Sequence, residues 1–416
     1  MLDAKVFLGI LLAFVLVFLS GHDHGSLPAE PVSEMMQSSA RPIASFYSPK
    51  NIHPQTRRLR YNPARRRFTP ALSFIESPTP NGLRIASAAQ TRRLRYGKRT
   101  PPESDRAQPR LYASLVNSRA YVVGAKLAAS GLYAFEGDTT WRHIGWNHPR
   151  VYGIAVDPND ANIIFLACGN GVLRTLDRGR SWRLTTDWRV TEALDIAIAS
   201  TNPERVYVAT AYGVWRSENR GDIWLESNRG LKRTFTQAVE VDHRNPKRLF
   251  AGTESGLYLS GDGAQSWTLV GPAEVTVLDI QQGTAAPEMW LAGTQTHGVW
   301  LSGDDGRTWQ KAEGVIAQAS IYSVAIDPTD RRNLAAVGWG AGVFISDDAG
   351  QSWRQQKTGL PTQNFYAVAF HPTTTGQIWA ATVEAGVFKS GDFGRTWKYH
   401  GLRGALVFDL TWYTKR

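Results

Sequence analysis

The stretch SGDDGRTW, from Ser302 to Trp309, decides the fold of this chain because it recurs at regular intervals. The same pattern, S/T-x-D-x-G-x-S/T-W, stands at 175–182, 346–353 and 390–397. Near matches lie at 217–224 and 260–267, whereas 134–141 keeps only the Thr and the Trp. The seven tryptophans are 41 to 44 residues apart, at positions 141, 182, 224, 267, 309, 353 and 397. A period of this length indicates a repeat architecture.

Each repeat is long enough for four short β-strands. A glycine followed by Val or Leu and a large apolar residue precedes each Trp, as in Gly342-Val343-Phe344. Further upstream, short alternating runs end at turn pairs such as Asp157-Pro158. In one repeat we expect strands at 152–156, 163–167, 172–175 and 181–184. Four strands per ~40–45 residues are typical of a propeller blade. The sequence therefore predicts an all-β, seven-bladed propeller over 111–416.

The two ends of this region are predicted to close the ring. The run ALVFDLT at 405–411 has the pattern of another innermost strand, while the first repeat has only a doubtful one at 111–116. We favour a last strand that completes the first blade, because pairing the two ends removes exposed sheet edges. In the alternative, 111–116 is the innermost strand of the first blade and 405–411 is an appendage.

The repeated motif is predicted to be structural. An Asp side chain accepts hydrogen bonds from the backbone of its own turn, Gly supplies a positive φ, and Trp packs between blades. We assign this role to Asp177, Gly179, Trp182, Asn219, Gly221, Trp224, Asp262, Trp267, Asp304, Gly306, Trp309, Asp348, Gly350, Trp353, Asp392, Gly394 and Trp397. Asp304-Asp305-Gly306 has a superficial likeness to a calcium loop, but the ligand spacing of an EF-hand is missing. We expect no metal and no cofactor.

These motifs resemble the BNR/Asp-box repeat, and the resemblance covers about 300 of the 416 residues. Proteins with this repeat include sortilin-like ectodomains and photosystem II assembly-factor-like propellers, which bind partners. They also include sialidases and xyloglucanases, which hydrolyse glycosides. The resemblance thus implies a WD40/YVTN/BNR-like propeller, and it allows both a binding scaffold and a glycoside hydrolase.

The N-terminal region differs in character from the repeats. Residues 6–19 form an unbroken apolar run that is shorter than the ~20 residues of a membrane-spanning helix. The run fits a signal peptide or an uncleaved signal anchor over 1–21. We therefore expect an extracytoplasmic protein, periplasmic or secreted, that contacts a membrane only through this N-terminal segment.

Residues 22–110 are rich in Arg, Pro and Ser and are predicted to be disordered. The segment 41–110 carries a net charge of +13, and QTRRLRY occurs twice in it, at 55–61 and 90–96. Such a tail is a candidate for contact with an anionic surface, and the alternative is a solvated linker. No nucleic-acid partner is expected for an exported protein.

Candidate binding residues fall in the loops that should share one end of the propeller. In each blade the loop between the second and third strands lies at this end, as does the loop that leads to the next blade. Exposed aromatic and charged residues there anchor interfaces, and aromatic rings stack on sugars. The candidates are Trp146, Trp188, Arg189, Tyr212, Glu254, His297, Trp339 and Glu384.

Two functions remain open on the sequence alone. The first is a non-enzymatic scaffold that binds a protein or a polysaccharide through the loop end. The second is a glycoside hydrolase, xyloglucanase-like or sialidase-like, which needs two paired carboxylates. Glu254 and Glu384 are the only acids in the loops between second and third strands, and three blades separate them. Because no catalytic set can be assembled, we favour the scaffold and assign no catalytic residue.

Overall fold

The computed structural model describes residues 108–117, 129–148, 150–356 and 358–415. All of them belong to one compact unit, Leu94–Arg416. The predicted signal segment 1–21 and residues 22–107 of the predicted linker lie outside the described residues. Within the described residues, no helix has the length and apolar character needed to cross a membrane.

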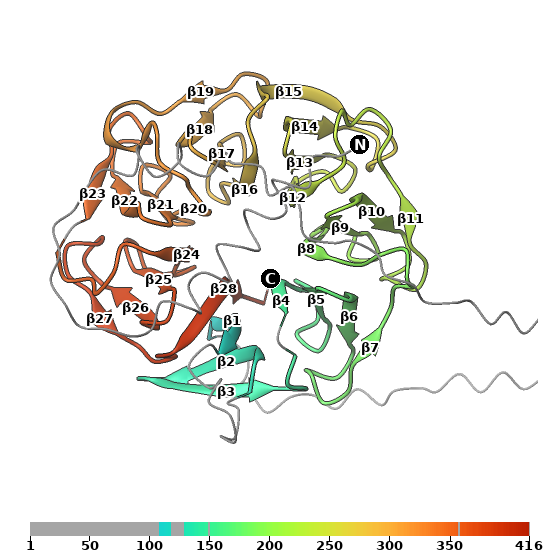
Figure 1. Cartoon of the computed structure of the whole chain (residues 1–416), viewed down its shortest axis with the longest axis horizontal. Coiled ribbons are helices and arrows are strands. Elements are labelled where there is room, and N and C mark those ends of the chain that lie inside the picture. The colour runs from blue at the N-terminus through green and yellow to red at the C-terminus, as the bar shows by residue number, and fades with distance from the viewer. Residues whose placement is uncertain (1–107, 118–128, 149, 357, 416) are drawn as a thin grey trace, which may run out of the picture. The chain divides into compact units, whose positions relative to one another are not determined.

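Seven four-stranded antiparallel sheets are arranged as a ring (Figure 1), which confirms the predicted seven-bladed propeller. Blade 1 contains β28 (Ala405–Tyr413), β1 (Arg110–Asn117), β2 (Gly131–Gly137) and β3 (Thr140–Ile144). Blade 2 contains β4 (Val151–Val156), β5 (Ile164–Cys168), β6 (Gly171–Thr175) and β7 (Arg183–Leu184). Blade 3 contains β8 (Ala193–Ile198), β9 (Val206–Thr210), β10 (Gly213–Ser217) and β11 (Leu225–Glu226).

The other four blades follow the same order, from the innermost strand to the outermost. Blade 4 contains β12 (Thr236–Val241), β13 (Leu249–Thr253), β14 (Gly256–Ser260) and β15 (Thr268–Ala273). Blade 5 contains β16 (Val277–Gln282), β17 (Trp290–Thr294), β18 (Val299–Ser302) and β19 (Gln310–Lys311). Blade 6 contains β20 (Ser323–Ile326), β21 (Leu334–Gly338), β22 (Gly342–Ser346) and β23 (Arg354–Gln356). Blade 7 contains β24 (Phe365–Phe370), β25 (Ile378–Thr382), β26 (Val387–Ser390) and β27 (Lys398–Tyr399).

The last strand completes the first blade, as the favoured prediction has it. β28 pairs antiparallel with the whole of β1, from Arg110 opposite Tyr413 to Asn117 opposite Ala405. The alternative, in which 111–116 is the innermost strand, is wrong because β1 pairs with β2 on its other side and so occupies the second position. Both edges of β1 are thereby paired, which leaves no open seam in the ring.

The hydrophobic core is divided among the junctions between blades. Seven buried clusters are present, and each contains residues of two neighbouring blades. In one of them Trp397 of blade 7 packs with Val343 and Ile345 of blade 6. Burial of apolar surface between sheets is the main stabilising term in such a core. The blades therefore depend on their neighbours for stability.

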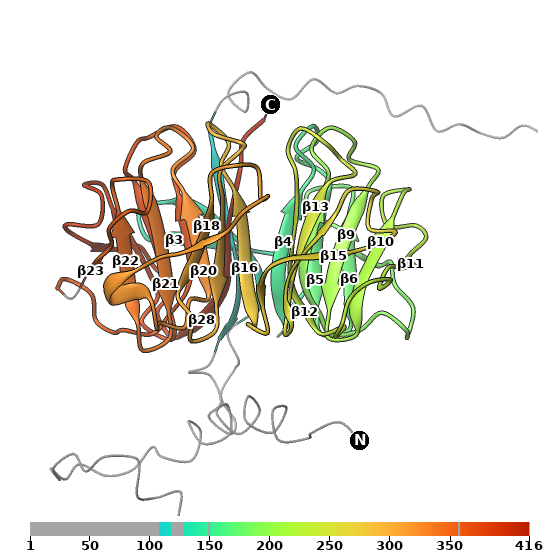
Figure 2. The ribbon, with the colours of Figure 1, turned by 90° about the horizontal axis from the view of Figure 1, so that it is seen from above.

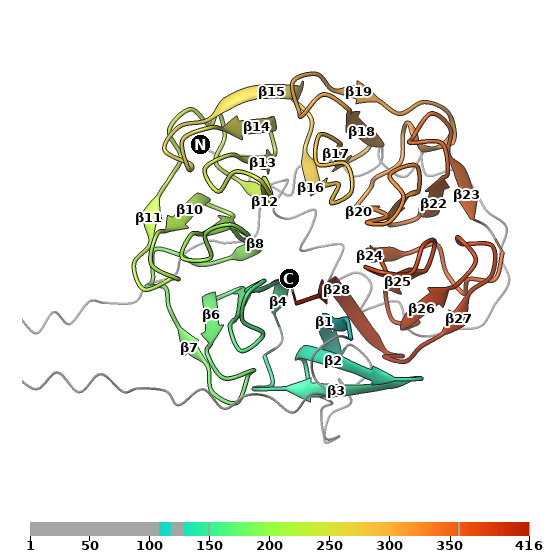
Figure 3. The same cartoon turned by 180° about the vertical axis from the view of Figure 1, so that it is seen from behind.

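The antiparallel order of the strands gives the ring two different faces, which a side view separates (Figure 2). One face carries the turns between first and second strands together with the Asp boxes, and we call it the Asp-box face. The opposite face carries the remaining loops, and we call it the loop face; a short 3-10 helix, η2 (Gly314–Ile316), lies there between blades 5 and 6. Figure 3 shows the ring from behind the view of Figure 1.

Candidate functional site

The Asp boxes form a repeated hydrogen-bond network within their own turns. In blade 2 the hydroxyl of Thr175 donates to Asp177 Oδ1 at 2.7 Å, and the backbone N–H of Gly179 donates to Thr175 Oγ1 at 2.9 Å. The backbone N–H and hydroxyl of Ser181 donate to the two carboxylate oxygens at 2.8 and 2.6 Å. In blade 7, hydrogen bonds from Thr396 lower the pKa of Asp392 to about 2. Both carboxylate oxygens are therefore engaged in holding the turn.

The box glycines also allow neighbouring blades to approach closely. Gly306 has a φ of 73°, which L side chains rarely adopt. A Cβ added there would lie 2.3 Å from Cζ of Phe250 in blade 4. The glycine thus serves the turn of its own blade and the contact with the preceding blade.

Three boxes depart from this pattern. In blade 4, Ala264 stands at the glycine position and keeps a positive φ of 62°. In blade 3, Asn219 replaces the Asp and still accepts from Ser217 and from the backbone N–H of Ile223. In blade 1, 134–141 forms a tight hairpin between β2 and β3, with Gly137 opposite Thr140. Trp141 of that hairpin keeps its junction role, since its Nε1–H donates to the carbonyl of His400 in blade 7 at 2.7 Å.

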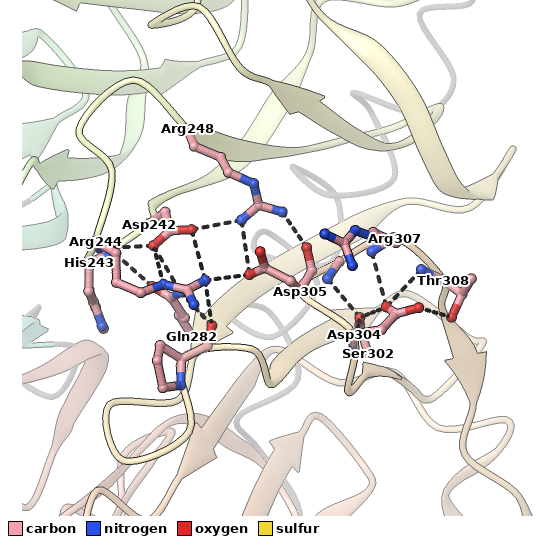
Figure 4. Close-up of polar contacts among 12 residues, drawn as sticks. Asp242, His243, Arg244, Arg248, Gln282, Ser302, Asp304, Asp305, Arg307 and Thr308 are labelled. Carbon is pink, nitrogen blue, oxygen red and sulfur yellow. Dashed lines mark hydrogen bonds and ion pairs between the residues drawn. The ribbon is translucent and has the colours of Figure 1, made fainter.

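The two acids of the calcium-like sequence in blade 5, Asp304 and Asp305, both form polar contacts with protein groups on the Asp-box face (Figure 4). Asp304 accepts from Ser302, Arg307 and Thr308, as the other box aspartates do. Asp305 pairs with Arg244 at 2.5 Å and with Arg248 at 3.4 Å. Both arginines belong to blade 4 and also bind its buried Asp242. The two acids are thus used for turn and blade contacts, and no metal-binding cluster of three or more His, Cys, Asp or Glu occurs in the described residues.

The loop face carries large exposed aromatic side chains. Trp188 is 85% exposed, Trp146 and Tyr212 are each 58% exposed, and Trp339 is 43% exposed. The first three belong to loops of blades 1 to 3, and Trp339 belongs to blade 6. Exposed tryptophans in this number are unusual on a surface without a partner, because burying each ring against a ligand is favourable.

The charged loop-face residues are mostly neutralised by one another. Arg189 binds Asp187 at 2.6 Å and stacks over the ring of Trp215, with its guanidinium carbon 5.9 Å from the ring centroid. A carboxylate oxygen of Glu254 lies 3.9 Å from a guanidinium nitrogen of Arg233, so these two side chains form a weak ion pair. His297 contacts the carbonyl of Gln295 at 3.0 Å through its Nδ1. The loop face therefore offers aromatic surface with little net charge.

The loop-face acids do not form the expected catalytic arrangement. Asp187 is held by Arg189, whose hydrogen bonds lower the pKa of the carboxyl, whereas a general acid needs a raised pKa. Glu254 in blade 4 and Glu384 in blade 7 lie on opposite sides of the ring (Figure 1). The structure thus does not bring the two predicted loop acids to one side of the propeller.

Three acids that the sequence analysis missed lie on innermost strands. Burial raises the pKa of Asp195 to about 7, of Asp279 to about 8 and of Asp409 to about 6. Each accepts a backbone N–H from the innermost strand of the next blade. The donors are Val239, Val324 and Ile154, at 2.9, 2.8 and 2.9 Å respectively. The sequence did contain a pattern that could have revealed two of these acids, because Leu-Asp-Ile occurs at both 194–196 and 278–280.

Large side chains meet at the inner ends of four adjacent blades. Tyr152 of blade 2 contacts Phe408 of blade 1, with ring centroids 5.0 Å apart. Phe408 contacts Tyr366 of blade 7 at 5.6 Å, and Tyr366 contacts Tyr322 of blade 6 at 4.8 Å. Each of these residues directly precedes the position that Asp195, Asp279 and Asp409 occupy in their own strands. Aromatic packing therefore joins the inner circumference on this side of the ring.

The best-formed cavity lies between blades 1 and 2 beside Trp146. Its lining includes His148 and Trp182, and its volume is about 10 Å³. A space of this size holds about one water molecule. It is therefore too small to be a ligand site, and the exposed surface of the loop face remains the candidate site.

Comparison with known proteins supports this description of the repeats. Residues 297–406 match the Sortilin-Vps10 family model, described as sortilin, neurotensin receptor 3. Over these residues the chain is similar to the sortilin family, whose propeller repeats are of the BNR type. The match spans about a quarter of the chain's length. A search of curated proteins with the sequence finds no significant match.

Several solved structures share the propeller fold. The GH74 enzyme of Niastella koreensis has a TM-score of 0.57 and 16% identity, over 72% of this chain and 55% of that one. The GH74 xyloglucanase of Xanthomonas campestris has a TM-score of 0.53 and 18% identity, over 67% of this chain and 52% of that one. YCF48 from Cyanidioschyzon merolae has a TM-score of 0.47 and 14% identity, over 60% and 84%. The chain thus spans about half the length of the two GH74 enzymes, and likenesses at this identity show the fold alone.

Proposed function

We propose that this propeller is a non-enzymatic binding scaffold that works outside the cytoplasm and holds a protein or polysaccharide on its loop face. The observation that carries the proposal is the set of exposed aromatic rings, Trp146, Trp188, Tyr212 and Trp339, on one face. Trp and Tyr are the residue types that supply most binding energy at interfaces. The ion pairs of Asp187 with Arg189 and of Glu254 with Arg233 favour a ligand of low charge.

The test is binding by the full chain and by single loop-face variants. We expect Trp188→Ala to weaken capture of the partner from an envelope extract, or of a neutral polysaccharide on a glycan array, by tenfold or more, because a truncated hot-spot residue costs ~2 kcal/mol or more. Gln351→Ala, at an exposed position of the Asp-box face, is the control and should bind as the wild type does. Equal binding by Trp188→Ala, Trp146→Ala and the wild type would refute the loop-face site.

A glycoside hydrolase is the second candidate. It is favoured by the raised pKa values of Asp195, Asp279 and Asp409, since a protonated carboxyl near neutral pH is what a general acid requires. Against it, each of these carboxyls already binds the backbone of the next blade. We expect no release of reducing ends from xyloglucan. Release that disappears in Asp195→Asn, with the variant still folded, would establish the enzyme instead.

A further inference from the structure

The Asp-box pattern is broken by large apolar side chains at two exposed positions on neighbouring blades. The second box position is Leu176 in blade 2, where the boxes of blades 3 to 7 have Glu, Gly or Asp. The seventh position is Ile223 in blade 3, where the other boxes have Ser or Thr. Leu176 is 57% exposed and Ile223 is 62% exposed. Neither departure improves the fold visibly, and departures from a local rule of this kind are expected at functional surfaces.

More apolar and basic residues surround these two positions. Leu184 and Leu225 are exposed on the outermost strands of the same blades, two residues after Trp182 and one residue after Trp224 respectively. Arg174 joins the two blades here, because it donates to the carbonyl of Arg220 and pairs with Asp222 at 2.9 Å. We call the exposed set the basic–apolar patch: Leu176, Arg180, Arg183, Leu184, Arg220, Ile223 and Leu225.

The three exposed arginines of the patch form no ion pair with the acids around them, because those acids have other partners. Asp222 pairs with Arg174, and Glu218 pairs with Arg205 at 2.8 Å. Asp177 accepts hydrogen bonds inside its own box, and Glu226 accepts one from Asn228. Among the described residues, no ion pair involves the side chains of Arg180, Arg183 or Arg220. Three guanidinium groups are therefore available to an anionic partner.

The first described strand begins on the same face of the ring as the Asp boxes of the patch. β1 begins at Arg110, opposite Tyr413 at the end of β28, on the Asp-box face. Burial raises the pKa of Tyr413, and the charges of Asp160 and Arg178 in blade 2 also act on it. Arg178 belongs to the same box as Leu176.

We propose that the basic–apolar patch lies against an anionic membrane surface, with phosphate headgroups at its three arginines and its four aliphatic side chains in the interface. Arginine and aliphatic side chains together are typical of membrane-surface contacts. A protein interface would be expected to centre on Trp and Tyr, and the four most exposed of these side chains, Trp146, Trp188, Tyr212 and Trp339, are on the opposite face. The Asp-box face would then point toward the membrane, and the loop face would point away from it toward a ligand.

The test uses a fluorophore at one position of the full chain, so that binding by the basic tail alone does not register. Cys168 is buried, which raises the pKa of its thiol to about 12, and it stays unlabelled in the folded protein. Ile223→Cys is labelled with an environment-sensitive dye, and Thr396→Cys, at the same box position in blade 7, is the matched control. Phosphatidylcholine vesicles with and without phosphatidylglycerol are the probe.

We expect the emission of the dye at position 223 to shift to the blue on vesicles that contain phosphatidylglycerol and to stay unchanged on pure phosphatidylcholine. The dye at position 396 should not shift on either. No shift at 223, or equal shifts at both positions, would overturn the proposal. A shift at 223 in a membrane-free extract, with none on vesicles, would replace the membrane by a protein partner.

A charge-reversal pair makes the test independent of the label. Arg180→Glu with Arg183→Glu should reduce affinity for the anionic vesicles on the order of tenfold or more, since each basic residue near such a surface contributes ~1 kcal/mol. Arg395→Glu with Lys398→Glu changes the charge of blade 7 by the same amount and should retain more of the affinity. Equal losses in the two double variants would show that only net charge matters and would refute a defined patch.

Discussion

Single tryptophans hold neighbouring blades together, and the structure shows how each one does so. Trp267 of blade 4 donates its Nε1–H to the carbonyl of Ser227 in blade 3 at 2.7 Å. Trp309 of blade 5 packs edge-on against Phe250 of blade 4, with ring centroids 5.8 Å apart. The period of these residues was readable in the sequence, and so was their place between blades. The hydrogen bonds between blades were not, because Trp224 and Trp267 donate to Thr185 and Ser227, which lie in the preceding repeat.

Replacing one of these rings should weaken the fold without touching the loop face. Trp397 is buried in the junction between blades 6 and 7, so Trp397→Ala should lower the free energy of unfolding by ~3–5 kcal/mol. Lys398→Ala, at the exposed next position, should change it by less than ~0.5 kcal/mol. Urea denaturation measures both variants. An unchanged midpoint for Trp397→Ala would contradict the packing role.

Adjacent strands and turns are joined by arginines that reach from one blade into the Asp box of the next. Arg174 donates to the carbonyl of Arg220, and Arg216 donates to that of Gly263 at 3.0 Å. Arg248 and Arg354 do the same to the carbonyls of Asp305 and Phe393. Each acceptor is the fourth position of its box, where φ is positive. The box turn therefore exposes a backbone carbonyl, and an arginine of the preceding blade donates a charged hydrogen bond to it.

Removal of one such donor tests this element. Arg174 is almost completely buried, so Arg174→Met should lower the free energy of unfolding by ~1.5–3 kcal/mol through loss of its charged hydrogen bonds. Arg183→Met on the neighbouring outermost strand is exposed and should have little effect on stability. Thermal unfolding followed by circular dichroism compares the two. Equal melting temperatures would show that Arg174 does not link the blades.

Around the whole ring, one position of the innermost strand alternates between an acid and a small residue, except at one place. From blade 1 to blade 7 the residues are Asp409, Gly153, Asp195, Ala238, Asp279, Ser323 and Ala367. A Cβ added at Gly153 would lie only 3.2 Å from Oδ1 of Asp195, which shows why a small neighbour is needed. Strict alternation is impossible with an odd number of blades. The interruption falls at Ser323, whose hydroxyl accepts from the backbone N–H of Val368 at 3.3 Å.

These three acids predict how stability depends on pH. Their pKa values of about 7, 8 and 6 exceed the ~3.9 of an unfolded Asp. The folded state therefore binds more protons than the unfolded state between pH ~4 and ~8, and stability should fall as pH rises through this range. The box aspartates act oppositely: Asp392, with a pKa of about 2, loses its contribution as pH falls below ~4. We expect the melting temperature to be highest near pH 4 to 5.

The inner acids can be separated from other titrating groups by substitution. Asp195→Asn combined with Asp279→Asn should flatten the fall in melting temperature between pH 5 and pH 8, because the amide does not ionise. Asp392→Asn should leave the melting temperature between pH 5 and pH 8 unchanged relative to the wild type and should change its dependence on pH only below pH ~4. A melting temperature of the wild type that rises from pH 5 to pH 8 would contradict the assignment.

Local spacing was sufficient to determine the class of fold and the number of blades. A box turn, a short strand and a tryptophan every 41 to 44 residues are properties of nearby residues, and hydrogen bonds within each turn enforce them. The same reasoning placed the exposed candidates on the loop face, since strand direction alternates along the chain. What these residues contact there is a property of their neighbours in space.

The choice between the two ways of closing the ring, the inner acids and the charge balance of the two faces were decided only by the tertiary structure. β1 became a second strand because β28, almost 300 residues later in the chain, pairs with its free edge. Asp195 links blades 3 and 4 because the backbone N–H of Val239 lies beside its carboxylate in the folded ring and donates to it. Contacts between residues so distant in sequence have no local signature, since they depend on the angle at which successive blades pack.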